Sequence, residues 1–198
     1  MRPNTLVLAC ALVFATAFAT VAQTPSALAQ KPTQTPAQKA SNATLPIPGE
    51  GTAHDIPGAK ETPNPALNYK VIFKLTKGAA KPTDVNEGLQ NVASLVNTMA
   101  KFGVPASHRH FAVIIYHDAT DIILTDAAYK ARHDGHSNPN IALMQALTRA
   151  GVELKVCGQA VFYKKIDPKT IQPEVELDLA AWTTILNLQT QGYILLGD

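Results

Sequence analysis

The sequence is poor in cysteine, with only Cys10 and Cys157 among its 198 residues. Cys10 lies in an N-terminal segment that we expect to be removed, so the mature protein would keep Cys157 alone. A single thiol excludes an intramolecular disulfide framework. We therefore expect a hydrophobic core to stabilise the folded part, and Cys157 becomes a candidate for chemistry.

The chain also lacks a large net charge. It has 17 basic and 15 acidic residues, for a formal net charge of +2. Loss of the N-terminal segment would remove one basic residue and leave about +1. A balance this close to zero does not indicate binding to nucleic acid or to an anionic membrane surface. We therefore expect no nucleic-acid partner.

No apolar run reaches the roughly 20 residues that a membrane-spanning helix requires. The longest, from about Leu6 to Val21, follows a short basic stretch and precedes small residues, which is the layout of a secretory signal peptide. We predict that cleavage after Ala29 removes residues 1–29, with cleavage after Ala22 as an alternative. Lipoprotein processing at Cys10 is disfavoured because the apolar run continues beyond it. The sequence therefore predicts a periplasmic or secreted protein with no membrane span.

Several motifs of well-known chemistry are missing. The sequence has no GxGxxG, no P-loop, no GxSxG and no CxxC. Nucleotide binding, α/β-hydrolase chemistry and dithiol exchange within this chain therefore have no support. We expect no cofactor.

The region 30–67 is rich in Pro, Ala, Thr, Gln and Ser and shows no apolar periodicity. Such a segment buries too little apolar surface to offset the entropy lost on ordering, so we predict a disordered linker. Its stretch LPIPGEG (45–51) is expected to stay undocked, with docking as the less favoured alternative. The folded domain then spans 68–198, an ordinary size for a single domain.

The domain alternates between two kinds of pattern. Short runs rich in aromatic and β-branched residues predict five strands. Longer segments with apolar residues on one face predict helices, the first capped by Asp84 with Glu87 and the second by Asn138, with Pro139 at its first position. The predicted strands are 69–75, 110–116, 152–156, 175–179 and 193–196, and the predicted helices are 84–102, 138–150 and 180–191.

This alternation predicts an α/β fold, a single three-layer domain whose mostly parallel five-stranded sheet is flanked by helices. In such sheets ligands bind outside the carboxyl ends of the strands. Candidate site residues are therefore those that directly follow a predicted strand.

Cys157 follows the third predicted strand, where a helix can begin. Partial positive charge at a helix start favours a thiolate, the form that acts as nucleophile and accepts sulfur. Gly158 would permit close approach of backbone or ligand, and Gln159 could supply an amide hydrogen bond. The alternative is that Cys157 is a buried structural residue.

His117 and Asp118 follow the second predicted strand and are expected beside Cys157 by the same topology. His117 could move a proton or stabilise a thiolate, or it could be an exposed loop residue without a role. Asn140, in the NPN helix start, completes the set of binding candidates.

The loop with His133, Asp134 and His136 raises the question of a metal site, because imidazole is a common metal ligand. Its spacing matches no metal signature, so we favour a loop that shapes the mouth of a pocket and expect no metal. Trp182 has helical spacing from apolar neighbours and is predicted to lie in the core or an interface.

The second half of the domain resembles the DsrE/DsrF-like family. The likeness rests on the NPN helix start, the stretch GVELKVCGQ and the final QGYILL, and it covers about Tyr69 to Leu196. The resemblance implies a compact α/β domain that assembles into dimers, trimers or hexamers. It also implies that a cysteine carries sulfur as a persulfide and relays it between donor and acceptor proteins. Cys157 matches the position of the family's cysteine.

We therefore expect a sulfur carrier rather than a stand-alone enzyme. The alternative is a non-catalytic oligomeric module in which Cys157 is inert and the strand-end pocket holds a ligand or a partner. A metal-binding role for the histidine loop is the least favoured hypothesis.

Overall fold

The computed structural model describes residues 45–51 and 53–196 of the chain. The predicted signal peptide and the first part of the predicted linker lie outside these residues. The described residues all belong to one compact unit, Pro36–Asp198.

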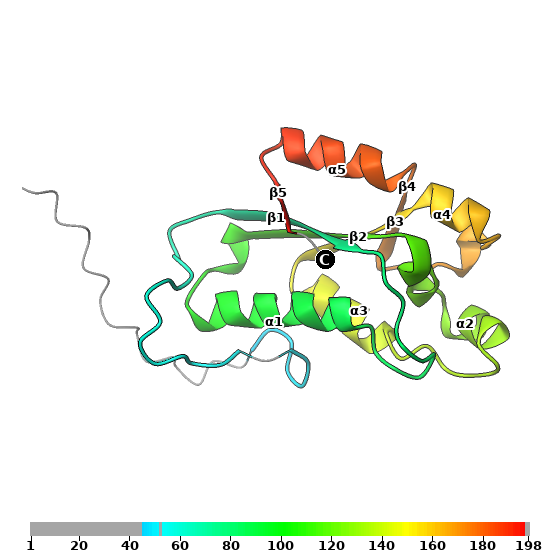
Figure 1. Ribbon diagram of the computed structural model, residues 1–198, viewed down its shortest axis with the longest axis horizontal. Helices are drawn as coiled ribbons and strands as arrows, with labels where there is room; N and C mark the ends of the chain where they lie inside the picture. The colour runs from blue at the N-terminus through cyan, green and yellow to red at the C-terminus, as the bar shows by residue number, and fades with distance from the viewer. Residues whose placement is uncertain (1–44, 52, 197–198) are drawn as a thin grey trace, which may run out of the picture. The chain divides into compact units, whose positions relative to one another are not determined.

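The domain is built on a five-stranded sheet with strand order β4-β3-β2-β1-β5, in which every pairing is parallel (Figure 1). This confirms the predicted α/β fold and all five predicted strands to within a residue or two. The strands are β1 Tyr69–Leu75, β2 Arg109–Ile115, β3 Val152–Cys157, β4 Val175–Asp178 and β5 Ile194–Leu196.

Helices α1 and α3 lie on one face of the sheet and α5 lies on the other, which gives the expected three layers (Figure 1). Within the described residues, no helix has the length and apolar character needed to cross a bilayer. The α-helices are α1 Glu87–Lys101, α2 Asp126–Arg132, α3 Ile141–Arg149, α4 Gly158–Tyr163 and α5 Ala181–Thr190. The 3-10 helices are η1 Ala106–His108, η2 His117–Ile123 and η3 Pro168–Thr170.

The sheet buries its two faces unequally. Successive side chains of a strand point to opposite faces, so the central strand β2 contributes to both cores. Phe111, Val113 and Ile115 join the larger core under α1 and α3, whereas Ala112 and Ile114 join a smaller cluster under α5. The smaller cluster consists of Ile72, Ala112, Ile114, Cys157, Ala180, Ala181 and Leu188. Cys157 thus belongs to the more thinly covered face.

The start of α1 corrects the predicted cap. Asn86, not Asp84, is the N-cap: its side-chain oxygen accepts hydrogen bonds from the backbone N–H groups of Gly88 (2.9 Å) and Leu89 (3.3 Å). The helix begins at Glu87, so the predicted capping box of Asp84 and Glu87 is wrong. An asparagine two residues closer to the apolar repeat satisfies the same free N–H groups.

The start of α3 is also later than predicted. The helix begins at Ile141, and Asn138 forms a turn before it by accepting a hydrogen bond from the backbone N–H of Asn140 at 3.0 Å. Pro139 is therefore not the first helical residue. The side-chain oxygen of Asn140 in turn accepts from the backbone N–H of Asn86 at 2.8 Å, which ties the starts of α1 and α3 together.

Part of the predicted linker is docked on the domain. Ile47 is 1% exposed and belongs to the larger core. Asn97 of α1 holds its backbone by accepting from its N–H (3.0 Å) and donating to its carbonyl (2.9 Å), and it also donates to the carbonyl of Glu50. The expectation that residues 45–51 stay undocked is therefore wrong. The docking depends on Ile47 and the buried side chain of Asn97, and a single pair of residues produces no periodic pattern in the sequence.

Candidate functional site at the carboxyl edge of the sheet

Strands β2 and β3 end side by side. Ile115 pairs with Val156, so the chain leaves β2 toward His117 next to the point where β3 ends at Cys157. On the other side, Cys157 pairs with Asp178, the last residue of β4. The topology therefore brings together segments that are far apart in the sequence, at the edge where α/β sheets bind their ligands.

A cavity of about 300 Å³ lies at this edge. Its walls come from the segment after β2, from the junction of β3 with α4, and from the first half of α5. The lining residues are Tyr116, His117, Cys157, Gln159, Ala160, Tyr163, Ala181, Trp182 and Ile185. Cys157 and His117, both proposed from the sequence, thus share one cavity.

Cys157 is both the last residue of β3 and the N-cap of α4. Its side chain is 6% exposed and packs in the cluster between the sheet and α5, yet it also lines the cavity. It is a free thiol. Both sequence interpretations therefore capture part of its environment: the sulfur is a packed core atom and part of a cavity wall.

His117 adopts an uncommon backbone conformation. Its φ angle is +55°, in the left-handed region that few residues other than glycine occupy, although histidine tolerates it better than most. Its carbonyl accepts a hydrogen bond from the Thr120 hydroxyl at 2.7 Å, and its ring lies 4.7 Å from that of Tyr116. Strained backbone of this kind is concentrated at functional sites. Here it occurs at the residue that lines the cavity beside the thiol.

The two residues after Cys157 have different surroundings. A Cβ atom on Gly158 would lie 2.6 Å from the carbonyl oxygen of Asp178, so a glycine is needed where α4 approaches the end of β4. The close approach expected at Gly158 is thus made by backbone. Gln159 is exposed, lines the cavity, and donates from its amide to the carbonyl of Leu179 at 3.4 Å.

Two of the sequence candidates do not belong to the cavity. Asp118 is exposed and is not among the lining residues. Asn140 is completely buried, and its side chain is engaged by Asn86 and Asn138 between the starts of α1 and α3. The structure therefore places Asn140 between the starts of α1 and α3, outside the lining of the cavity.

The sequence did not identify the apolar walls of the cavity. Tyr163 and Trp182 line it although they are 77% and 65% exposed, so Trp182 is not the core residue that was one of its two predicted placements. Helical spacing places Ala181 with Ile185, and Gln159 with Tyr163, on common faces. The spacing does not predict that α4 and α5 present these faces to the same cavity.

The histidine loop forms a polar cluster of its own. Asp121 of η2 lies 3.4 Å from His133 and 3.4 Å from Lys164, and the His133 ring stacks on Tyr129 with centroids 4.1 Å apart. Burial, reinforced by the charge of Asp121, raises the pKa of Tyr129. None of these residues lines the cavity at Cys157. Among the described residues, no group of three or more His, Cys, Asp or Glu side chains is placed to hold a metal ion.

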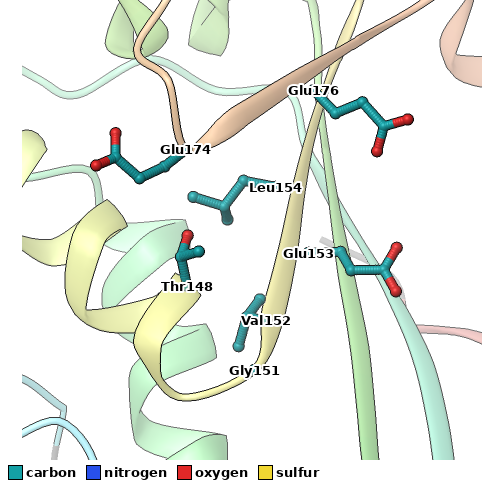
Figure 2. A pocket seen from close by; sticks show the side chains of 7 residues that line it. All are labelled: Thr148, Gly151, Val152, Glu153, Leu154, Glu174 and Glu176. Carbon is teal, nitrogen blue, oxygen red and sulfur yellow. The ribbon is translucent and has the colours of Figure 1, made fainter.

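A second cavity, of about 330 Å³, lies at the opposite, amino end of β3 (Figure 2). Its lining includes three glutamates, but the side chains of Glu153 and Glu176 point away from that of Glu174 (Figure 2). The carboxylates therefore do not converge on one point. No thiol or imidazole lines this cavity, so the candidate site is the one at Cys157.

Lys155 occupies the same face of β3 as Cys157, two residues earlier. It forms ion pairs with Glu153 and Glu176. Burial by itself lowers the pKa of Lys155, but the hydrogen bond that Lys155 donates to Glu176 and the charges of Asp178, Glu176 and Glu153 together raise it above its usual value. The cation is thus neutralised by its carboxylate neighbours.

Comparison with known proteins gives one family. The family model described as "DsrE/DsrF-like family" matches residues 70–196, well over half of the chain. No curated protein matches the chain significantly. Among solved structures, the chain is similar to a protein of unknown function, MTH1491 from Methanobacterium thermoautotrophicum. The identity is 17% and the TM-score 0.49, over 66% of this chain and 99% of that one.

Proposed function

Because this chain belongs to the DsrE/DsrF-like family, we propose that it is a sulfur-relay protein that carries sulfur as a persulfide on Cys157. One observation carries the proposal: the free thiol of Cys157 lines a cavity at the carboxyl edge of the sheet together with His117. A carrier needs a thiol that a small donor can reach and that bulk water reaches poorly. Cys157, a residue that is 6% exposed and lines a cavity, supports both needs.

The transfer step follows from thiol chemistry. The Cys157 thiolate attacks the outer sulfur of a donor persulfide, R–S–SH. A new S–S bond forms on Cys157 while the donor's S–S bond breaks, and its electron pair leaves with the donor sulfur as R–S⁻. His117 takes the thiol proton and returns it to the leaving thiolate, so the products are the Cys157 persulfide and R–SH.

Mass spectrometry of the intact protein tests this step. After incubation with a persulfide donor, we expect the wild type to gain one sulfur atom that reducing agent removes, and Cys157→Ser to gain none. His117→Asn is the matched variant for the second role, because asparagine also tolerates a positive φ. It should reach the same final adduct but load roughly 100-fold more slowly. Absence of any adduct on the wild type would refute the relay.

A second function, a non-catalytic binding module, is favoured by the packing of Cys157 in the apolar cluster under α5. The two functions predict different thiol reactivity in the folded protein. A carrier thiol reacts with iodoacetamide at a rate comparable to that of a small free thiol, whereas an inert core thiol reacts only after denaturant unfolds the protein. The alkylation rate with and without denaturant separates the two.

We further propose that the protein works outside the cytoplasm as a homo-oligomer. The signal-like segment supports export, and N-terminal sequencing of the exported protein should begin at residue 30. Assembly is supported by large apolar side chains that are exposed on α4, α5 and the segment before α5 but do not line the cavity, namely Phe162, Leu179 and Leu186. Light scattering should give a dimer, trimer or hexamer mass, and a monomer mass would contradict assembly.

A further inference from the structure

Resting on the proposed function, we propose that the Cys157 cavity selects sulfur donors whose carrier group is uncharged and apolar. It should discriminate against donors in which sulfur is attached to an anionic group. The inference depends on the walls of the cavity and on the charges around it.

The walls offer an anion no lysine or arginine to pair with. None of the nine lining residues carries a carboxylate, an ammonium or a guanidinium group. Proteins bind carboxylates and oxyanions with arginine, lysine or several converging N–H donors. An anionic carrier group would therefore lose water beside Tyr116, Trp182 and Ile185 without meeting a lysine or arginine, which is unfavourable.

The charges beside the cavity point the same way. Asp178 stands opposite Cys157 in the pairing of β3 with β4, and its carboxylate accepts a hydrogen bond from Thr184 at 2.6 Å. It adds negative charge beside the thiol. Lys155, the cation on the same face of β3, is held by Glu153 and Glu176. Lys155 is the only lysine or arginine in β3 and β4, so neither strand offers an unpaired cation to an incoming anion.

The same walls suit an apolar group. Tyr163 and Trp182 have most of their surface exposed although they line the cavity, so a ligand that covers them removes apolar area from water. A volume of about 300 Å³ is at the small end of ligand sites and accommodates one ring with its persulfide. Transfer from such a donor is balanced as described above: the donor leaves as a neutral thiol and no oxidant or reductant is consumed.

The experiment compares two hydropersulfides of the same reactive group. Benzyl hydropersulfide carries a neutral ring, and glutathione hydropersulfide carries charged groups. The loading rate of Cys157 with each is divided by the rate of the same donor with a small thiol in solution, so that intrinsic reactivity cancels. We expect the normalised rate for the benzyl donor to exceed that for the glutathione donor about tenfold or more.

Two variants change the wall without touching the thiol. Trp182→Lys replaces an exposed apolar wall residue by a cation and should abolish the preference for the benzyl donor. Asn187→Lys adds the same charge at an exposed position of α5 outside the lining and should leave the preference unchanged. Tyr163→Lys repeats the test from α4, in case the first variant does not fold.

The outcomes separate the two proposals. If both donors load Cys157 at equal normalised rates, or the glutathione donor loads faster, the selectivity is refuted and the relay stands. A preference that neither wall variant alters likewise refutes the role given to the walls. If neither donor loads the thiol, the relay itself fails and the selectivity fails with it.

Discussion

Cys157 is buried and yet lines a cavity because it is the last residue of its strand. Within β3, alternation directs Cys157 to the face covered by α5, and there it joins the apolar cluster. One residue later the chain turns into α4, so no further strand residue covers the sulfur from the carboxyl side. A cysteine two residues earlier, at the position of Lys155, would lie among glutamates and outside the lining.

Gly158 provides a prediction at the scale of one residue. Gly158→Ala places a Cβ atom 2.6 Å from the carbonyl oxygen of Asp178, which is backbone and yields little. We expect the free energy of unfolding to fall by about 1–3 kcal/mol, although alanine is the better helix former. Denaturant unfolding measures the change. Gln159→Ala, at the exposed neighbouring position, should stay within about 0.5 kcal/mol of the wild type.

At the scale of the element, α1 does more than cover the sheet. Its start is tied to α3 through Asn86 and Asn140, and its middle holds residues 45–51 through Asn97. Near its end, the side chain of Lys101 donates to the carbonyl of Ala53 at 2.8 Å. The helix thus fixes a segment that precedes the region matched by the family model.

Asn97→Ala tests this attachment. The substitution removes four hydrogen bonds, to Ile47, Glu50 and Gly51, and leaves the backbone polar groups of Ile47 without their partners, so we expect a loss of about 2 kcal/mol in unfolding free energy. Limited proteolysis between residues 45 and 56 should also become faster. Asn91→Ala removes the same side chain from an exposed position of α1 and serves as the control. Equal behaviour of the two variants would show that the segment is not held by Asn97.

For the whole molecule, three raised pKa values predict a loss of stability at alkaline pH. Burial raises the pKa of Tyr129 and Tyr193 above 10.0, and the carboxylates around Lys155 raise its pKa above 10.5. A raised folded-state pKa contributes stability that is complete below the unfolded-state value and is lost as pH rises through the folded-state value. The unfolding free energy should therefore decline above about pH 10.

Single substitutions show which titrating groups cause this decline in the unfolding free energy. Tyr193→Phe removes one of the titrating groups and should make the decline between about pH 9 and pH 11 shallower. Tyr163→Phe is the same substitution at an exposed side chain and serves as the matched comparison. The measurement is the denaturant midpoint as a function of pH. A slope that Tyr193→Phe does not change would mean that other groups cause the decline.

The sequence by itself determined the order of the elements and pointed to two candidate residues of the site. Alternation and helical spacing need only a few neighbouring residues, so the five strands and the segments of α1, α3 and α5 could be predicted. The rule that ligands bind after strands directed attention to Cys157 and His117. Local patterns also located the helix starts to within about two residues, but not which asparagine caps α1 or begins the turn before α3.

Only the tertiary structure decided what surrounds the thiol. The apolar wall arises because α4 and α5, separated in the sequence by η3 and β4, present Tyr163, Trp182 and Ile185 to the same space. The burial of Asn140 and the docking of Ile47 depend on contacts more than 45 residues apart. Such contacts are fixed by how helices pack across a sheet, and that packing leaves no repeat along the chain that a reader of the sequence could recognise.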